Sequence, residues 1–453
     1  MSMPCLLLPI PQQLKRFLTI VCFLSCGFLQ AQDAVKGQAP GRWKTGYLDI
    51  HHINTGRGNA AFCVLPDGTT MLVDAGELSP LDARTFTERN APQRPDTTKK
   101  PYEWLVSYIT QVIEKPVIDY ALLTHFHDDH FGAWYPSAPV SADGSFLRTG
   151  ISGVGDLLKI NTLVDRAYPM YNYPYNMREQ SAVYGGGEIE FGKTMANYFR
   201  FIRSKSDAGM KQQAFRTGTD RQFILLHDAV TYPSFHIRNV KCNQWIWTGK
   251  DSSVVKHFPD RQPGDNKWPD ENSLSLAITI SYGNFIYYTG GDNPGEVFPG
   301  DDPLRDVETA IAQAVGPVDV AVMDHHGNRD AINAFQVKTM HPQVWVGQTW
   351  SSDHPGYEVL RRLRNKAIYP LPGDLFSTNM LEANRLVIGP MVDDAYKSQQ
   401  GHILVRVMPG GNSFYVIVLD DDQPVITVKD VFGPYMSQAR PAAAQTIKIN
   451  QKK

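Results

Sequence analysis

The stretch LLTHFHDDHFGA, residues 122–133, places five ionisable side chains within six positions directly after an apolar segment: His125, His127, Asp128, Asp129 and His130. Packing such a cluster against a core is costly, because its polar groups lose their hydration there. A bound cation would offset that cost, since imidazole nitrogens and carboxylate oxygens are typical ligands of zinc and other divalent first-row metals. The stretch therefore predicts a metal site rather than a solvated polar turn.

The local pattern indicates how these side chains converge. Residues 117–125 have the apolar character of a strand, and residues two apart on a strand share a face, so we expect His125 and His127 to project together. Asp129 and His130 are expected from the following turn and helix start. Asp128 is expected to be a turn or cap residue.

Strand and helix patterns recur along the chain and favour a layered α/β domain with its site along one edge. Helices are expected at 102–114, 303–315 and 356–366. Strands are expected within 46–76, 117–125, 221–227, 234–242, 273–292, 318–327, 341–350 and 401–420. We expect a linker at about 32–44, one domain at about 45–436 and a polar tail at about 437–453. Within the domain, residues 134–220 are expected to form an insertion rich in Gly, Pro and Tyr.

The first 31 residues predict a secretory signal peptide. Lys15 and Arg16 precede a short apolar run, 17–29, which is followed by a small residue, Ala31, near the expected cleavage point. The run is too short for a comfortable transmembrane helix, and no transmembrane domain is expected in the mature chain. A lipid anchor at Cys26 is not favoured, because apolar residues continue beyond it. We therefore expect export to the periplasm or the extracellular space.

Composition and charge exclude few classes of function. The 453 residues carry a net charge of −2, which gives no global electrostatic argument for a nucleic-acid partner, although a local basic groove would suffice. Cys63 and Cys242 are the two cysteines beyond the leader, so the mature chain permits one disulfide but is no disulfide scaffold. The sequence leaves the oligomeric state open.

The H-x-H-x-D-H pattern at 125–130 resembles the defining motif of the metallo-β-lactamase-fold hydrolases. Asp74 in VDAG matches the family's first-motif aspartate, and Asp292 in YYTGGD and His326 in DHHG match its later motifs. Within it, residues 48–76 look like the opening of the soluble hydrolase domain of ComEC-type DNA-uptake proteins, and ENSLSLAITISYGNFIYYTGGD, VMDHHGN and SSDHPGYEVLRRL follow in that subgroup's order. Bacterial phosphorylcholine esterases are similar in the same motifs.

The resemblance implies a four-layer αβ/βα sandwich with two mixed sheets packed face to face. It also implies a site for one or two zinc ions, with manganese as the alternative. One metal would be bound by His125 and His127, and the second by Asp129, His130 and His326. Asp292 would bridge the two.

Further roles follow from the same resemblance. A metal-bound hydroxide would be the nucleophile, with Asp129 as ligand and proton acceptor. His325 would face the substrate and stabilise a leaving or phosphoryl oxygen. Asp74 would orient ligands from behind, and His354 would line the site.

Two departures from the family pattern affect this assignment. The broader superfamily has a further histidine ligand before the late aspartate, whereas residues 238–247 offer Cys242 and Asn243 but no histidine. Asn59, in GRGN, stands where the subgroup has an acidic residue. Without the further histidine, the first metal would be weakly held or completed by another group. Asn59 removes no ligand from the set above.

The sequence thus predicts an exported metal-dependent hydrolase that acts on a phosphodiester or another phosphate ester. A lactonase or β-lactamase activity would use the same site and is one alternative. The other is a non-catalytic surface protein that binds a glycan or choline. Its aromatic wall would come from the tyrosines of the insertion, although packing is the favoured explanation for them: Tyr168, Tyr171, Tyr173, Tyr175 and Tyr184.

Overall fold

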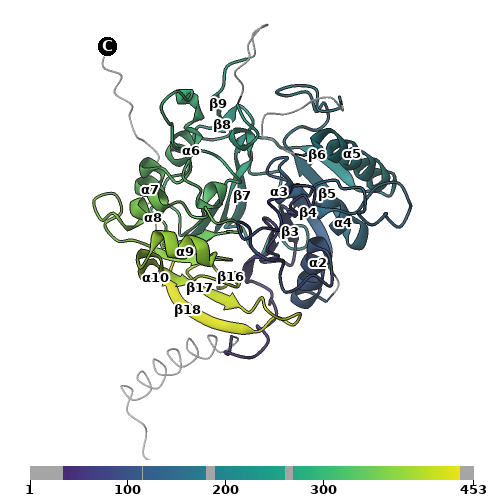
Figure 1. The fold of residues 1–453 in the computed structure, drawn as a ribbon. Helices are drawn as coiled ribbons and strands as arrows, with labels where there is room; N and C mark the ends of the chain where they lie inside the picture. Colours follow the sequence, from purple (N-terminus) through teal and green to yellow (C-terminus); the bar gives the residue numbers. More distant parts are fainter. Residues whose placement is uncertain (1–33, 115, 180–188, 261–268, 439–453) are drawn as a thin grey trace, which may run out of the picture.

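The computed structural model describes residues 34–114, 116–179, 189–260 and 269–438. The expected signal peptide, Tyr184 and all but the first two residues of the expected polar tail lie outside these ranges. Within them the chain forms two mixed β-sheets of nine strands each and nine α-helices (Figure 1). No described helix combines the length and the apolar character that a membrane crossing requires.

The first sheet has the strand order β18-β17-β16-β1-β2-β3-β4-β5-β6. Strands β3 to β6 run parallel to one another, and the other neighbours pair antiparallel. The strands are β1 Leu48–His52, β2 Ala61–Val64, β3 Thr70–Val73, β4 Val117–Leu122, β5 Lys159–Asp165, β6 Lys211–Ala214, β16 His402–Val407, β17 Ser413–Leu419 and β18 Val428–Met436.

The second sheet has the order β15-β14-β13-β12-β11-β10-β7-β8-β9. Strands β11 to β15 are parallel, and the remainder are antiparallel. The strands are β7 Phe235–Cys242, β8 Trp245–Trp247, β9 Val254–Lys256, β10 Ala277–Tyr282, β11 Phe285–Thr289, β12 Val320–Val322, β13 Val344–Gly347, β14 Asp374–Ser377 and β15 Tyr396–Ser398.

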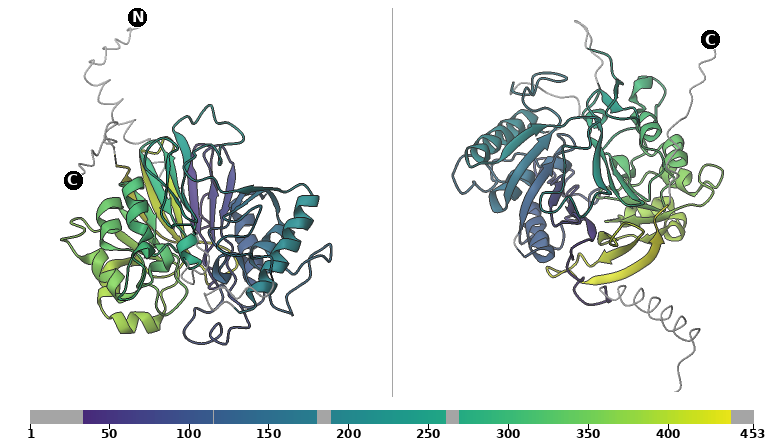
Figure 2. Two further views of the ribbon diagram at one scale, coloured as in Figure 1. Left: turned by 90° about the horizontal axis from the view of Figure 1, so that it is seen from above. Right: turned by 180° about the vertical axis from the view of Figure 1, so that it is seen from behind.

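The helices cover the outer faces of the two sheets (Figure 2). Helices α2 Pro101–Val112, α4 Gly150–Leu157 and α5 Phe191–Asp207 pack on the first sheet. The second sheet carries α6 Val307–Val315, α7 Ala334–Met340, α8 Tyr357–Arg364, α9 Glu382–Ile388 and α10 Met391–Ala395. The short α3 Asp128–Phe131 and the 3-10 turns η2 Asn272–Leu274, η3 Pro303–Arg305 and η4 Asp324–Gly327 lie in loops.

Local sequence signals set the ends of the helices. Helix α2 has Pro101 in its first turn, and the Glu103 carboxylate accepts a hydrogen bond from the Lys100 backbone N–H at 2.7 Å. Helix α6 begins after Asp306, whose side chain accepts from the backbone N–H of Thr309, and it ends before a glycine.

The alternation of side chains along the strands builds separate apolar layers. In β3, Met71 points into the layer between the two sheets, and its neighbour Leu72 points toward the helices outside. Ile50 of β1 and Ile280 of β10 meet in the layer between the sheets. Because each fully buried aliphatic side chain contributes roughly 1.5–3 kcal/mol, this shared layer holds the two sheets face to face. The expected α/β architecture with two mixed sheets is confirmed.

Two local expectations about strands were wrong for identifiable reasons. Strand β4 ends at Leu122, not at residue 125, because the Thr124 backbone N–H donates to the Asp74 side chain and not to a neighbouring strand. Residues 221–227 form no strand, since backbone N–H groups there bind side chains of the 67–69 turn. The expected insertion, 134–220, supplies β5 and β6 and so extends the first sheet.

Candidate metal centre

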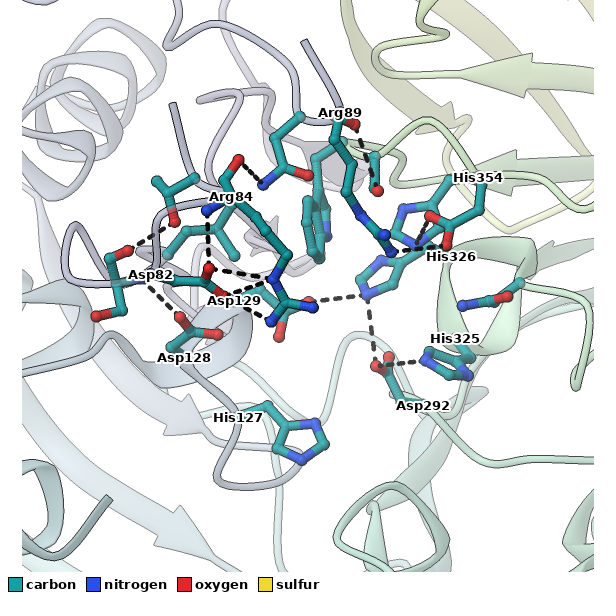
Figure 3. Close-up of a pocket in the computed structure, with 18 of the residues that line it drawn as sticks. Asp82, Arg84, Arg89, His127, Asp128, Asp129, Asp292, His325, His326 and His354 are labelled. Carbon is teal, nitrogen blue, oxygen red and sulfur yellow. Dashed lines mark hydrogen bonds and ion pairs between the residues drawn. The ribbon is translucent and has the colours of Figure 1, made fainter. Parts of the chain in front are cut away.

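The candidate site residues lie in loops that follow the carboxyl ends of strands in both sheets. Asp74 follows β3, and the histidine-rich stretch follows β4. In the second sheet Asp292 follows β11 and His326 follows β12. Since β3 and β4 are parallel, as are β11 and β12, the ends of each pair meet at one edge of their sheet, and the loops from both edges face one cavity (Figure 3).

One group of donor atoms comes from Asp129, His130, Asp292 and His326, all of which are buried. The Nε2 atom of His326 lies 2.9 Å from Oδ2 of Asp129 and 3.4 Å from Oδ2 of Asp292. The Nε2 atom of His130 lies 3.1 Å from Oδ1 of Asp292. One donor atom from each of the four residues lies within 4.8 Å of all the others, so the group could hold a metal ion.

A second group is formed by His125, His127 and Asp292. Nε2 of His125 lies 3.1 Å from Nδ1 of His127 and 3.8 Å from Oδ2 of Asp292. The two histidines converge through the loop that follows β4, so the predicted shared strand face was wrong although the predicted proximity was right. Asp292 belongs to both groups, which is the position a bridging ligand requires.

Several nitrogen and oxygen atoms in these groups are buried and make no hydrogen bond to a described residue, although some lie within ion-pairing distance of one another. They are Nε2 of His127, His130 and His326, and Oδ1 of Asp292. A buried polar group without a partner costs about 1–3 kcal/mol, and native proteins contain few of them. Four such atoms in one cluster, all of metal-ligating type, fit a cation better than they fit an ordinary polar core.

The electrostatics of the cluster favour a positive charge. Burial alone would lower the pKa of His326, but the carboxylates of Asp292 and Asp129 raise it to about 10. Burial would likewise raise the pKa of Asp292, yet His130 and His326 hold it well below its usual range. The carboxylates therefore attract either protons on the histidines or a metal cation, and the two compete.

Hydrogen bonds from Nδ1, on the side of each ring away from the donor atom, orient the histidines of the first donor group. Nδ1 of His130 donates to Oδ2 of Asp74 at 2.7 Å, and the Thr124 hydroxyl donates to the same oxygen at 2.7 Å. Nδ1 of His326 donates to the backbone carbonyl of Gln348 at 2.9 Å. Both rings thereby present Nε2 to the cluster, which is how proteins fix the tautomer of metal-ligating histidines. The structure thus places Asp74 where the resemblance expected an orienting residue.

Strained and closely packed backbone surrounds the donors. Asp74, His325 and His326 have φ values of 61°, 46° and 57°, in the left-handed region that costs most non-glycine residues about 1–3 kcal/mol. A Cβ on Gly76 would lie 1.9 Å from the carbonyl oxygen of Asp129. That oxygen also accepts the backbone N–H of Asn59 at 2.7 Å, so Asn59 fixes a ligand's main chain.

His325 and His354 line the cavity beside the donor groups. Nδ1 of His325 donates to Asp330 at 2.6 Å, and its Nε2 lies 3.2 Å from the side-chain nitrogen of Asn272. The ring of His354 stacks on that of His326, with centroids 4.6 Å apart and planes 21° apart. Sequence reasoning missed Asp330, which lies five residues after His325 in HHGNRD.

The segment without the expected third histidine, 238–247, ends strand β7 and forms β8. Cys242 is free and buried, as is Cys63, and it belongs to neither donor group among the described residues. Beside it, Nε of Arg166 donates to Glu271 at 2.6 Å, and Glu271 accepts the backbone N–H of Phe126 at 2.9 Å. This buried ion pair fixes the loop between His125 and His127, and sequence reasoning missed it.

The donor groups form part of the wall of a cavity of about 320 Å³. Its lining is mostly polar and charged. Besides the residues already described, sequence reasoning missed those contributed by the loop after β3 and by the loop after β13: Ser79, Asp82, Arg84, Thr85, Arg89, Asn90, Trp350, Ser351 and Asp353. No periodic pattern marks such loop residues in the sequence.

A comparison of the chain with protein-family models and with curated proteins found no match. The described residues bring together four histidines and two aspartates from both sheets, in two groups that share one carboxylate and could hold metal ions.

Proposed function

We propose that the protein is a metal-dependent hydrolase of phosphate esters, phosphodiesters above all, built on a metallo-β-lactamase fold. The observation that carries the proposal is the pair of donor groups sharing Asp292 on the wall of a polar cavity. Two mixed sheets packed face to face, with the donors at their joint edge, agree with the fold that the sequence resemblance implies.

The donor sets fit the expected cations. His125, His127 and Asp292 would hold one ion, and the group of Asp129, His130, Asp292 and His326 would hold the other. Imidazole-rich sites suit zinc, and the carboxylates leave manganese as the alternative. Bound cations would supply Lewis acidity toward a phosphoryl oxygen and lower the pKa of water, the chemistry that two-metal phosphoesterases use.

The remaining residues position protons around the reacting phosphate. Oδ2 of Asp129 lies at the cavity wall, where it would accept the proton of the attacking water. Burial would lower the pKa of His325, but Asp330, which accepts from Nδ1, and Asp292 raise it. The protonated ring would present its Nε2–H toward Asp292 and donate a hydrogen bond to the leaving oxygen. The ring of His354 stacks on that of His326 and would help to hold its orientation.

The alternative of a glycan- or choline-binding protein loses its main support. Tyr171 is buried and packs against Phe126 and Tyr198, and its hydroxyl donates to Asp165. None of the described insertion tyrosines lines the cavity. Export remains part of the proposal, on the evidence of the basic, then apolar, N-terminal residues.

Metal analysis of the purified protein, followed by a substrate panel, tests the proposal. We expect zinc or manganese to copurify, and a bis-aryl phosphodiester to be cleaved in preference to a phosphomonoester, a lactone or a β-lactam. His127→Ala and Asp292→Ala should abolish turnover while the far-ultraviolet circular dichroism stays unchanged. His236→Ala serves as the control, because His236 is exposed on β7 and lies outside both donor groups. Absence of metal together with absence of hydrolysis under every added metal would refute the proposal.

A further inference from the structure

Two arginines of one loop reach into the cavity beside the donor groups. The loop comprises residues 79–91, between β3 and α2, and carries Arg84 and Arg89 on the cavity wall. Figure 3 shows both side chains reaching toward the middle of the cavity, where Asp129 and His326 lie. Neither arginine belongs to a sequence motif discussed above, and neither has a part in binding metal or moving protons.

The 79–91 loop is hydrogen-bonded to residues on two sides of the cavity. On one side, the backbone N–H of Ser79 donates to the Asp128 carboxylate at 2.6 Å. On the other, the backbone N–H of Ala91 donates to the carbonyl of Trp350 at 2.7 Å. The backbone N–H of Ser352 also donates to the carbonyl of Arg89, at 2.8 Å. These bonds hold the loop's main chain in place over the site.

A buried arginine supports the same loop from beneath. Nη1 of Arg57 donates to the carbonyl of Thr85 at 3.0 Å and to that of Ala91 at 2.7 Å. The side chains of Arg84 and Arg89 therefore extend from a preorganised backbone, which reduces the entropy lost when they bind a ligand.

Both arginines have N–H donors that no described residue accepts. Arg84 binds Asp82 through Nε and Nη2, and Arg89 binds Asp353 through Nη2. Nη1 of each arginine makes no hydrogen bond to any described residue. A guanidinium carries five N–H groups in a planar, forked arrangement, and this arrangement matches the spacing of phosphate oxygens. The side chains are 63% and 50% exposed, and exposed ion pairs add little to stability, so the fold gains little from these cations.

The distribution of charge indicates what the arginines recognise. Under the proposed function, the carboxylates and histidines of the two donor groups bind the cations and the phosphate that is cleaved. Arg84 and Arg89 enter the cavity from the 79–91 loop, whereas His325, which would face the leaving oxygen, enters it from η4 (Figure 3). Arginine pairs beside a phosphoryl site suit a second anionic group on the same substrate.

We propose that Arg84 and Arg89 bind a second phosphate group of the substrate, which makes the natural substrate a phosphodiester that carries a further phosphate. The inference rests on the proposed function, since it names the substrate class of the same site. A cavity of about 320 Å³ is at the lower end of the range for small-molecule sites, in keeping with a small substrate whose remainder extends into solvent.

A matched pair of chromogenic diesters tests the inference. The p-nitrophenyl ester of thymidine 5′-phosphate and the same ester with an added 3′-phosphate have identical leaving groups and differ by one phosphate. We expect wild-type protein to prefer the 3′-phosphorylated ester in kcat/KM by at least about tenfold, the size of effect expected of charge-assisted hydrogen bonds. Arg84→Ala and Arg89→Ala should each remove most of that preference and leave kcat/KM for the other ester within about twofold.

Binding provides a readout independent of turnover. In calorimetric titrations without added metal, thymidine 3′,5′-bisphosphate should bind wild-type protein more tightly than thymidine 5′-monophosphate does. Both alanine variants should lose that difference, and Arg84→Lys should retain part of it, because lysine keeps the charge without the fork. Arg385→Ala is the matched control, since Arg385 forms a similar two-oxygen pair with Asp393 on an exposed helix outside the cavity.

The outcomes separate this inference from the proposed function. Equal hydrolysis of the two esters, or equal losses on both in the arginine variants, overturns the second-phosphate site and leaves the phosphodiesterase proposal standing. Arginine-dependent binding of the bisphosphate without hydrolysis of either ester, under zinc or manganese, supports the second-phosphate site and overturns the enzymatic proposal.

Discussion

Asp74 and His130 form a buried pair in which Nδ1 of the imidazole donates a hydrogen bond to the carboxylate over 2.7 Å. The Asp74 carboxylate also accepts the backbone N–H and the hydroxyl of Thr124. Asp74 thereby joins the end of β3 to the loop after β4 and turns Nε2 of His130 toward Asp292. Asp74 thus sets the direction of one donor atom of the metal site and contributes no donor atom of its own.

Asp74→Asn tests this orienting role. The amide cannot accept as strongly from His130, so the imidazole loses its fixed orientation, and metal affinity should fall by about 10- to 100-fold. Competition with a chromophoric zinc chelator measures the change. Asp119→Asn is the control, because Asp119 is also buried and accepts from Thr70 at the other end of β4. Unaltered zinc affinity in Asp74→Asn would contradict the orienting role.

Neighbouring aspartates in the central stretch should behave differently. Asp129 contributes an oxygen to a donor group, whereas the Asp128 carboxylate accepts the backbone N–H of Ser79. Asp129→Asn should therefore lower metal content and activity, whereas Asp128→Asn should keep the metal and loosen the 79–91 loop. Metal analysis of both variants, combined with limited proteolysis of the loop, distinguishes them. Similar metal loss in the two would show that the assignment within the Asp-Asp pair is wrong.

Gly76 is expected to tolerate no side chain. A Cβ there would lie 1.9 Å from the Asp129 carbonyl oxygen, so Gly76→Ala must displace the backbone of a candidate ligand. We expect a loss of about 1–3 kcal/mol in the free energy of unfolding, typical of overpacking, together with weaker metal binding. Gly144→Ala is the control, because no atom lies within 4 Å of a Cβ there. The control should be destabilised through its positive φ and bind metal normally.

The pH dependence of stability should reveal a buried histidine far from the donor groups. Nδ1 of His402 accepts the backbone N–H of Asn54 at 3.0 Å, and burial lowers the pKa of His402 to about 3. Between pH 6.5 and pH 3 the unfolded chain binds the extra proton, so the free energy of unfolding falls as the pH falls. We expect this histidine to contribute a loss of roughly 4 kcal/mol across that window.

Urea unfolding of metal-free protein at several pH values between 8 and 4 measures this effect. His402→Gln should keep a hydrogen-bond acceptor for Asn54 and lose the titration, so its stability should depend less on pH than that of wild-type protein. The difference between the two curves isolates His402 from His51 and His52, whose pKa values burial also lowers. Parallel curves would contradict the assignment.

The convergence of His125, His127, Asp129 and His130 could be anticipated from their spacing after an apolar segment. Asp292 and His326 were assigned to the same site by the family resemblance and not by spacing, because they lie more than 160 residues further along the chain. The structure brings them to the first group because the loops after β11 and β12 face those after β3 and β4.

The supporting interactions could not be anticipated in the same way. Arg57, Arg166 and Glu271 act by hydrogen bonding to backbone groups or to one another across long sequence separations. A single buried arginine or glutamate has no periodic signature, and its partner is fixed only when the chain is folded. The early end of β4 has the same origin, since a side chain of another loop captures the Thr124 N–H.

The division of the candidate ligands between the two sheets has a consequence for when a cation can be acquired. A nascent chain that has left the ribosome as far as α5 already contains Asp129 and His130, but neither Asp292 nor His326 has yet been translated. Until the second sheet is made and docked, an ion meets only an incomplete and solvent-open set of ligands. Metal binding at this site would therefore follow the synthesis of both sheets, and a bound ion would link the early half of the polypeptide to the late half.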